Sequence, residues 1–129
     1  MTRVLIVDDS EAIRTILSDI LKQSYTQLEI ILATNGIEGV QLAESEQPQA
    51  ILLDWSMPYM DGLHTAEHLR NSPLTQHIPL VAMTAEQDHQ QVSERLSQLC
   101  NALLFKPFNV DELIASLHFI DNSIPNGSE

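Results

Sequence analysis

Five short apolar segments alternate with segments of helical periodicity along this chain. The apolar segments are residues 4–7, 30–33, 50–54, 80–83 and 102–105. After each of them, apolar residues recur every three or four positions, as they do on the buried face of an amphipathic helix. Strands that are apolar along their whole length are typical of a parallel sheet covered on both faces. The pattern therefore predicts an α/β fold of five βα units, although it does not give the order of the strands.

Polar residues mark where two of the helices begin. Asn35 is predicted to cap the second helix, with Glu38 in the capping-box position. Asn109 and Glu112 have the same relation at the start of the last helix, whose apolar stripe continues to Ile120. Prolines at positions 48 and 73 are expected to end the second and third helices.

The composition fits one domain and argues against the binding of polyanions. The chain has 129 residues, of which 43% are hydrophobic, and this is enough to form a core. Acidic residues outnumber basic ones by 18 to 6, for a formal net charge of −12. Such a chain repels nucleic acid and anionic membranes and attracts Mg²⁺ and basic partners, although the same charge also serves solubility alone. We therefore predict no direct nucleic-acid binding and no membrane association.

The cysteine content and the N-terminal sequence bear on location. The single cysteine, Cys100, precludes a disulfide within the chain, and we expect it to be a small core residue without a redox role. The apolar run after Met1 ends at Val7, so it is too short for a signal peptide, and no stretch approaches the length of a membrane span. We therefore predict a soluble cytoplasmic protein.

Polar and charged residues stand where four of the predicted strands end. The first strand ends in Asp8 and Asp9, the third in Asp54, the fourth in Thr84 and the fifth in Lys106. In an open α/β sheet, ligands bind beyond the carboxyl ends of the strands. If these strands are neighbours, three carboxylates, a hydroxyl and an ammonium group converge on one rim of the sheet.

These residue types together suit phosphoryl transfer. Three adjacent carboxylates repel one another, and Mg²⁺ relieves that repulsion because it prefers oxygen ligands. A carboxylate such as Asp54 can attack phosphorus and carry an acyl phosphate. The metal ion and Lys106 would neutralise charge on the phosphoryl group, and the Thr84 hydroxyl would donate a hydrogen bond to it. We therefore hypothesise that Asp54 binds Mg²⁺ and is phosphorylated.

Each of these residues also has an ordinary interpretation when it is taken alone. An aspartate at a strand end, such as Asp8 or Asp9, often caps a helix or forms a turn. Thr84 alone is typical of a strand end, and Lys106 alone is typical of a solvated surface. The hypothesis rests on their occurrence together at four of five strand ends.

Four motifs give the sequence a family resemblance. It resembles the response-regulator receiver domains of two-component signalling in "VLIVDDS" at 4–10, "LLDWSMPYMDG" at 52–62, "MTA" at 83–85 and "KPF" at 106–108. Asp54 and Thr84 are 30 residues apart, and Thr84 and Lys106 are 22 apart, as is usual in that family. The resemblance covers essentially the whole chain.

The resemblance implies a fold and a domain boundary. The implied fold is a doubly wound, flavodoxin-like three-layer sandwich, with a parallel five-stranded sheet of order 2-1-3-4-5. We expect residues 1–122 to form the receiver domain and residues 123–129 to form a flexible C-terminal tail. The chain would be either a stand-alone receiver or a domain of a longer protein.

The resemblance also implies roles for the rim residues. Asp54 matches the phosphoacceptor, Thr84 the switch hydroxyl and Lys106 the phosphate-binding lysine, which precedes a cis peptide bond. Asp9 matches the acid that binds Mg²⁺ directly and Asp8 the acid that reaches it through water.

The remaining metal ligands implied by the resemblance are Asp54 itself and the backbone carbonyl of Ser56, two positions further along the chain. Four residues are therefore expected at the magnesium site, namely Asp8, Asp9, Asp54 and Ser56.

The implied function is a phospho-accepting switch. A sensor histidine kinase or a histidine phosphotransfer protein would be the phosphoryl donor, and a downstream effector protein or domain would read the change. The resemblance implies no enzymatic activity beyond catalysis of the domain's own phosphorylation and dephosphorylation. The readout surface in the family is formed by the fourth helix, the fifth strand and the fifth helix.

One position on that readout surface departs from the family pattern. An aromatic residue commonly stands three positions before the lysine, and here that residue is Leu103. The aromatic Phe105 stands directly before Lys106 instead, so the face that it reaches is expected to be reversed or shifted. Coupling between Thr84 and the outer surface would then differ from that of the family.

Three other functions are consistent with parts of the sequence. "HTAEH" at 64–68 fits a zinc metallopeptidase pattern, although His64 and His68 fall on the predicted exposed side of the third helix. Phosphatases of the haloacid dehalogenase type also use a phospho-aspartate, but they carry their two acids two residues apart on the first strand, whereas Asp8 and Asp9 are adjacent. A receiver-like binding module that is never phosphorylated is the third alternative.

Overall fold

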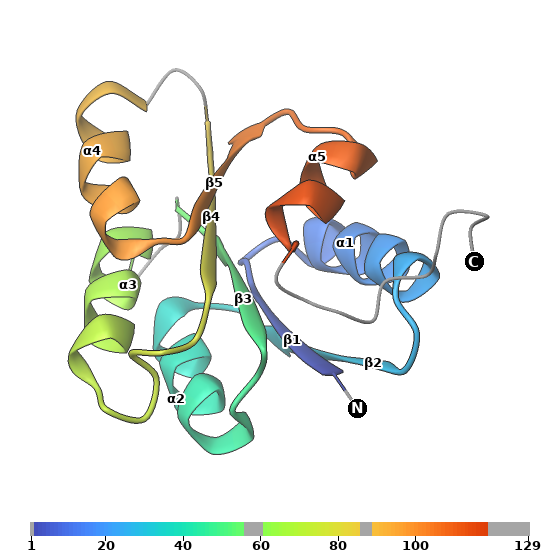
Figure 1. Cartoon of the computed structure of the whole chain (residues 1–129), viewed down its shortest axis with the longest axis horizontal. Coiled ribbons are helices and arrows are strands. Elements are labelled where there is room, and N and C mark those ends of the chain that lie inside the picture. The colour runs from blue at the N-terminus through green and yellow to red at the C-terminus, as the bar shows by residue number, and fades with distance from the viewer. Residues whose placement is uncertain (1, 56–60, 86–88, 119–129) are drawn as a thin grey trace.

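A computed structural model of the chain describes residues 2–55, 61–85 and 89–118. The strands are β1 (Thr2–Val7), β2 (Leu28–Ala33), β3 (Ala50–Asp54), β4 (Leu80–Ala85) and β5 (Ala102–Lys106). The helices are α1 (Glu11–Ser24), α2 (Gly36–Glu46), α3 (Gly62–Asn71), α4 (His89–Leu99) and α5 (Val110–Ser116). All five strands are parallel and lie in the order β2-β1-β3-β4-β5, which confirms the predicted fold (Figure 1).

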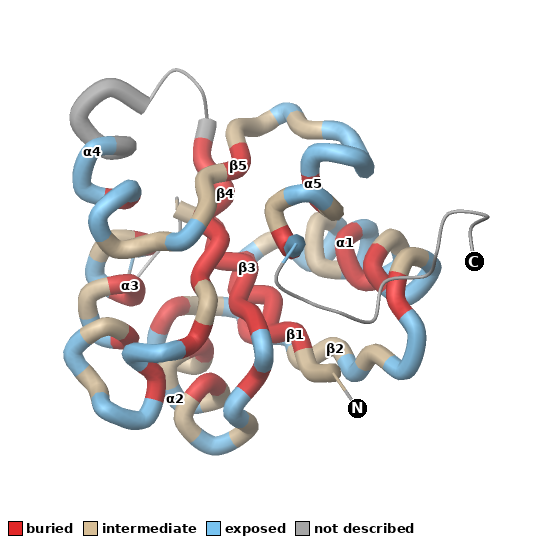
Figure 2. Tube along the Cα trace, in the orientation of Figure 1, coloured by how far each residue is buried: buried red, intermediate tan, exposed pale blue. Residues whose placement is uncertain are grey.

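The helices form two layers around the sheet. Figure 1 shows α1 and α5 on one side of the strands and α2, α3 and α4 on the other. Each side has its own core, because successive side chains of a strand point to opposite faces. Val4 and Ile6 of β1 pack toward α1 and α5, whereas Leu5 and Val7 pack toward α2 and α3. Figure 2 shows the resulting continuous burial of the central strands between helices with exposed outer faces.

The predicted helix caps are present, with one difference in detail. The Asn109 side chain accepts from the Glu112 backbone N–H, and the Glu112 side chain accepts from the Asn109 N–H, so this capping box is confirmed. Asn35 caps α2 as predicted and accepts from the Glu38 N–H at 2.9 Å. The Glu38 carboxylate, however, accepts from the backbone N–H and the hydroxyl of Thr34. It therefore holds the end of β2 as well as the start of α2.

The element boundaries differ from the predicted ones mainly at strand ends. β1 and β2 each begin two residues earlier than their apolar runs, because Thr2, Arg3 and Glu29 pair in the ladder without being apolar. β4 and β5 extend over Thr84 and Lys106, so both of these side chains project from the sheet itself. The prediction that the last helix continues to Ile120 is wrong: α5 ends at Ser116, because Leu117 is its C-cap and has left the helical conformation (φ −107°, ψ 29°). The predicted domain boundary at residue 122 lies outside the described residues.

The two residues that depart from the family pattern share one face of β5. Leu104 between them is 5% exposed and packs in the core beside α1 and α5. Leu103 and Phe105 flank it, so both point to the opposite face, and both are half-buried. The aromatic position is therefore shifted by two residues along the strand, and the face is not reversed.

Within the described residues, none of the helices is both long enough and apolar enough to cross a lipid bilayer.

Candidate functional site

The predicted rim residues come together at the carboxyl ends of β1, β3, β4 and β5. Asp8 follows the last residue of β1, and Asp54 is the last residue of β3. Asp54 pairs with Met83 of β4, so Thr84 lies one residue beyond it on the adjacent strand. Lys106 is the last residue of β5. The strand order that the sequence left open is what makes these four strands neighbours.

Three carboxylates form a cluster at this rim. One carboxylate oxygen each from Asp8, Asp9 and Asp54 lies within 4.8 Å of the other two. Asp8 and Asp54 are only 1% and 4% exposed, whereas Asp9 is exposed. Partly buried like charges at this separation repel strongly. A bound cation is the simplest way to compensate them.

Asp8 is held by hydrogen bonds to its backbone and to one of its two carboxylate oxygens. Its backbone N–H donates to the Ala33 carbonyl at 3.1 Å, and its Oδ1 accepts from the Ser10 N–H at 2.9 Å. Its Oδ2 is buried and has no hydrogen-bond partner among the described residues. Burial raises the pKa of the Asp8 carboxyl, the Ser10 hydrogen bond lowers it, and the charge of Asp54 raises it further. Oδ2 is therefore a preformed ligand atom that carries a desolvation cost until something binds it.

Lys106 is the cation of the site. Its Nζ lies 3.0 Å from Asp54 Oδ1 and forms an ion pair with that nearly buried carboxylate. The Lys106 side chain is itself 36% exposed, so it reaches the site from the solvent side of the rim. The Lys106–Pro107 peptide bond is cis, as the resemblance implied.

Thr84 supplies a hydroxyl without a partner. Its side chain is 2% exposed, and Oγ1 has no hydrogen-bond partner among the residues that the structure describes. A buried hydroxyl normally pairs, and leaving it unpaired costs free energy. Thr84 therefore offers a donor to any ligand that enters beside Asp54.

Ser56, the fourth implied metal ligand, lies outside the described residues. The structure brings together Asp8, Asp9 and Asp54, but it does not describe where the backbone carbonyl of Ser56 lies relative to them. The predicted role of Ser56 is thus neither confirmed nor contradicted, and it stays a prediction.

Two features of the site were missed by the sequence analysis. Arg14 of α1 donates from a terminal guanidinium nitrogen to the backbone carbonyl of Asp8 at 2.7 Å. Gly62 begins α3 against the backbone of Trp55 and Asp54: a Cβ at position 62 would lie 2.7 Å from the Trp55 Cα and 3.1 Å from the Asp54 carbonyl oxygen. Asp61 caps α3, and Gly62 is the first residue of this helix.

The alternative zinc site receives no support from the described part of the chain. His64 and His68 are exposed on α3, as the helical pattern predicted. The His64 ring contacts Asp61 at 2.8 Å, an interaction between neighbours at the start of the helix. Among the described residues, Asp8, Asp9 and Asp54 are the one group of three or more potential metal ligands close enough to share an ion.

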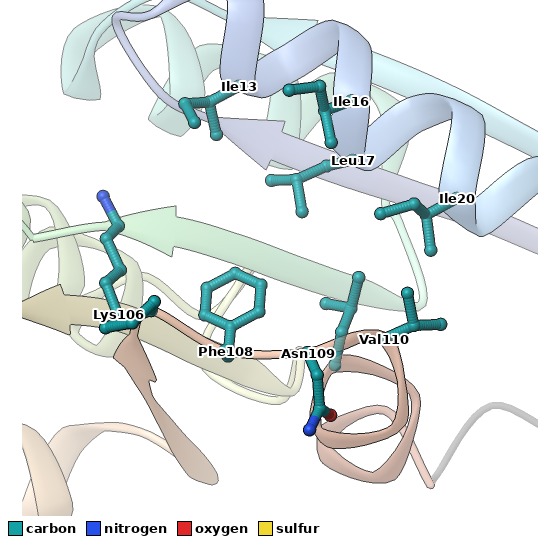
Figure 3. A pocket seen from close by; sticks show the side chains of 10 residues that line it. Ile13, Ile16, Leu17, Ile20, Lys106, Phe108, Asn109 and Val110 are labelled. Carbon is teal, nitrogen blue, oxygen red and sulfur yellow. The ribbon is translucent and has the colours of Figure 1, made fainter.

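An apolar pocket opens beside the rim, between α1 and the start of α5. It has a volume of about 460 Å³. Figure 3 shows Ile13, Ile16, Leu17 and Ile20 of α1 facing Phe108 and Val110, with Lys106 at one end. Ile16 and Val110 are 52% and 47% exposed, so the pocket forms part of the outer surface.

The donor set of the acidic cluster fits a hard divalent cation. Carboxylate oxygens are the ligands that Mg²⁺ prefers, and Asp8 Oδ2 has no hydrogen-bond partner among the described residues. Thiolate and imidazole ligands, which favour softer metals, are absent from this cluster. The residues present are thus suited to Mg²⁺.

Known proteins share both the sequence pattern and the fold. Residues 4–118 match the family model of the response regulator receiver domain. The response regulator MprA of Mycobacterium ulcerans (strain Agy99) is 35% identical over 118 residues, which cover 89% of this chain and 48% of that protein. The chain thus spans about half the length of the curated relatives that it matches.

Solved structures agree with the sequence relatives. The chemotaxis protein CheY4 of Vibrio cholerae has a TM-score of 0.81 at 28% identity, covering 94% of this chain and 99% of that one. The receiver domain of the sensor histidine kinase PA1611 of Pseudomonas aeruginosa has a TM-score of 0.80 at 28% identity, covering 92% of this chain and 95% of that one. The latter structure has a magnesium ion coordinated in its active-site cleft. With its motifs, strand order and rim residues, this chain belongs to the response regulator receiver domain family of two-component signalling.

Proposed function

We propose that this receiver domain accepts a phosphoryl group on Asp54, with Mg²⁺ bound by the acidic cluster. The observation that carries the proposal is the environment of Asp54. Its carboxylate is 4% exposed, lies within 4.8 Å of the Asp8 and Asp9 carboxylates, and is paired with Lys106 at 3.0 Å. A nucleophile that is flanked by a cation on one side and by a cluster of metal-ligand type on the other suits attack on an anionic phosphoryl group.

Asp8, Asp9 and Asp54 would hold the metal ion, and the backbone carbonyl of Ser56 is a further predicted ligand. When bound, Mg²⁺ supplies charge neutralisation for the phosphoryl oxygens. Oδ2 of Asp8 supports this assignment, because this buried carboxylate oxygen has no hydrogen-bond partner among the described residues.

The transfer of the phosphoryl group needs no reactant other than the phosphorylated histidine of the donor. A carboxylate oxygen of Asp54 attacks phosphorus, and a phosphorus–oxygen bond of an acyl phosphate is formed. The bond from phosphorus to the donor histidine nitrogen breaks, and the ring leaves with that electron pair as neutral imidazole when its other nitrogen carries a proton. Lys106 then pairs with a phosphoryl oxygen, and the Thr84 hydroxyl donates to another.

The phosphoryl group would change the charge and the hydrogen bonding at the rim. It adds a charge of roughly −1.5 to −2 and three strong acceptor oxygens. Thr84, whose hydroxyl has no partner among the described residues, gains one when it turns toward the phosphoryl group. Movement of Thr84 is transmitted to β5, because Phe105 is its neighbour in the register of β4 and β5. We propose that a downstream effector reads this change.

The apolar pocket beside Lys106 supports a protein as the phosphoryl donor. A sensor histidine kinase or a phosphotransfer protein must bring a histidine ring to Asp54 and therefore must contact the surface next to the rim. Ile16 and Val110 are exposed apolar side chains on that surface. Exposed apolar patches beside a polar site are typical of protein-binding surfaces. The cytoplasmic location predicted from the sequence stays a prediction.

Intact-mass measurement after incubation with acetyl phosphate tests the proposal. We expect one added phosphoryl group on the wild type in Mg²⁺, none in excess chelator, and none on Asp54→Asn. Asp111→Asn, which changes an exposed acid in the first turn of α5, should behave as the wild type. A modified Asp54→Asn protein would refute the assignment, and a wild type that stays unmodified and binds no beryllofluoride would favour a binding module that is never phosphorylated.

A further inference from the structure

Arg14 makes a contact that ties α1 to the acidic cluster. Its guanidinium donates to the backbone carbonyl of Asp8 at 2.7 Å, and its own backbone N–H donates to the Ser10 carbonyl at 3.0 Å. Arg14 is half-buried, and it lies in α1 one turn beyond the N-cap Ser10. It is therefore close to the acids but bound to their backbone.

The contact completes a set of hydrogen bonds around Asp8. The Asp8 N–H is bonded to the Ala33 carbonyl, and Asp8 Oδ1 is bonded to the Ser10 N–H. Ser10 in turn caps α1 by accepting from the Ile13 N–H. With the Asp8 carbonyl bonded to Arg14, every polar group of Asp8 except Oδ2 has a partner within the described part of the chain.

We propose that Arg14 is a positioning residue for metal binding by Asp8 and Asp9. The Asp8 carbonyl belongs to the peptide unit that joins Asp8 to Asp9, and this unit is planar and stiff. A donor that fixes the orientation of this carbonyl thus also fixes the direction in which Asp9 leaves the strand. The inference rests on the proposed function for the identity of the metal ion as Mg²⁺.

Repulsion explains why such a restraint is needed. In the metal-free protein, the Asp8, Asp9 and Asp54 carboxylates repel one another, and Asp9 is exposed and can swing away from the cluster. Arg14 opposes that movement at the backbone, so less order has to be created when the ion binds. Preorganisation of this kind raises affinity because it lowers the cost of binding, and residues that orient metal ligands typically contribute about tenfold or more to affinity.

Arg3 provides a control at the start of β1, whereas Arg14 contacts Asp8, the residue that follows the end of β1. It is also a half-buried arginine of the β1 region whose guanidinium donates to a backbone carbonyl, that of Glu46, at 2.9 Å. It also pairs with Glu29. Arg3→Met therefore removes one positive charge, one carbonyl contact and the ion pair with Glu29, all of them away from the rim.

The experiment compares Arg14→Met, Arg14→Lys and Arg3→Met with the wild type in two measurements. Calorimetric titration with MgCl₂ gives the dissociation constant of Mg²⁺. Hydrogen exchange followed by NMR in chelator reports the Ser10 amide, which donates to Asp8 Oδ1 in the metal-free protein.

We expect Arg14→Met to weaken Mg²⁺ binding about tenfold and to speed Ser10 exchange. Arg14→Lys, which keeps one donor, should fall between Arg14→Met and the wild type, and Arg3→Met should match the wild type in both measurements. If Arg14→Met does not fold, Arg14→Lys decides by the same two readouts. Unchanged affinity and exchange in the Arg14 variants, or equal losses in Arg3→Met, would overturn the inference, whereas a wild type that binds no Mg²⁺ would instead overturn the proposed metal site.

Discussion

Lys106 Nζ and Asp54 Oδ1 lie 3.0 Å apart, although the two residues are separated by 52 positions in the chain. β4 lies between their strands in the sheet, so the long lysine side chain reaches across the rim to the carboxylate. The pair leaves Asp54, which is nearly buried, with a cation on one side and the acidic cluster on the other. This arrangement places a nearly buried carboxylate between a cation and a cluster of potential metal ligands.

Loss of this pair should destabilise the metal-free protein. In Lys106→Met, Asp54 loses its cation while the repulsion from Asp8 and Asp9 remains. Because the lysine side chain is 36% exposed, we expect a modest loss of about 1 kcal/mol in the free energy of unfolding. Urea unfolding in chelator measures it, with Lys22→Met on the exposed side of α1 as the control. Equal stability of the Lys106 and Lys22 variants would contradict the prediction.

Asp8→Asn should stabilise the metal-free protein at neutral pH. Burial and the charge of Asp54 raise the pKa of the Asp8 carboxyl in the folded state above its ordinary value of 3.8. The folded state then binds this proton more tightly than the unfolded state does. The favourable contribution of Asp8 to stability is therefore fully present below the unfolded pKa and is lost as the pH rises through the folded pKa.

Urea unfolding of the wild type and Asp8→Asn in chelator, at mildly acidic and at neutral pH, checks this prediction. The stability gained by the variant should grow as the pH rises. Addition of MgCl₂ should stabilise the wild type and have little effect on the variant. A variant that is less stable than the wild type at neutral pH would show that the Asp8 carboxylate is already compensated.

Gly62→Ala should displace the start of α3 from the end of β3. The new Cβ would meet the Trp55 Cα at 2.7 Å and the Asp54 carbonyl at 3.1 Å, and backbone atoms cannot yield as a flexible side chain can. We expect a loss of about 1–3 kcal/mol in stability and a changed emission of Trp55. Gly36→Ala at the first position of α2 controls for alanine at a helix start. Equal stability changes in both variants, with wild-type emission, would count against a tight contact at Gly62.

Cys100 should react slowly with alkylating reagents in the native protein. Burial raises the pKa of its thiol to about 12, so the reactive thiolate is scarce at neutral pH. Iodoacetamide labelling followed by mass spectrometry should be fast in urea and much slower under native conditions. The structure places Cys100 partly buried against the core rather than within it. Rapid native labelling would contradict this partial burial of the thiol.

The residues of the rim could be predicted from the sequence because each of them stands at the end of an apolar strand. All strands of a parallel sheet point the same way, so Asp8, Asp54, Thr84 and Lys106 had to meet at one edge once their strands were neighbours. The strand order itself came from the family resemblance, since apolar runs of similar length carry no information on which strand pairs with which.

Other parts could not be predicted because they involve the backbone. Arg14 bonds to the Asp8 carbonyl, and a backbone acceptor exists at every residue, so no pattern of side chains announces the contact. Glu38 had the right spacing for a capping box, but its carboxylate accepts from Thr34, because the backbone N–H groups of Thr34 and Asn35 are donors one residue apart that compete for the same carboxylate. Phe105 could be assigned to a face only when Leu104 was seen to be buried.

Localisation of the phosphoryl group tests the central claim most directly. Borohydride reduces an acyl phosphate of aspartate to homoserine, so the wild type is treated with acetyl phosphate and Mg²⁺, reduced, digested and analysed by mass spectrometry. We predict homoserine at position 54 alone, and none when chelator replaces Mg²⁺. Homoserine at Asp8 or Asp9, or a stable phosphate with no homoserine at position 54, would contradict the assignment of Asp54 as the phosphoacceptor.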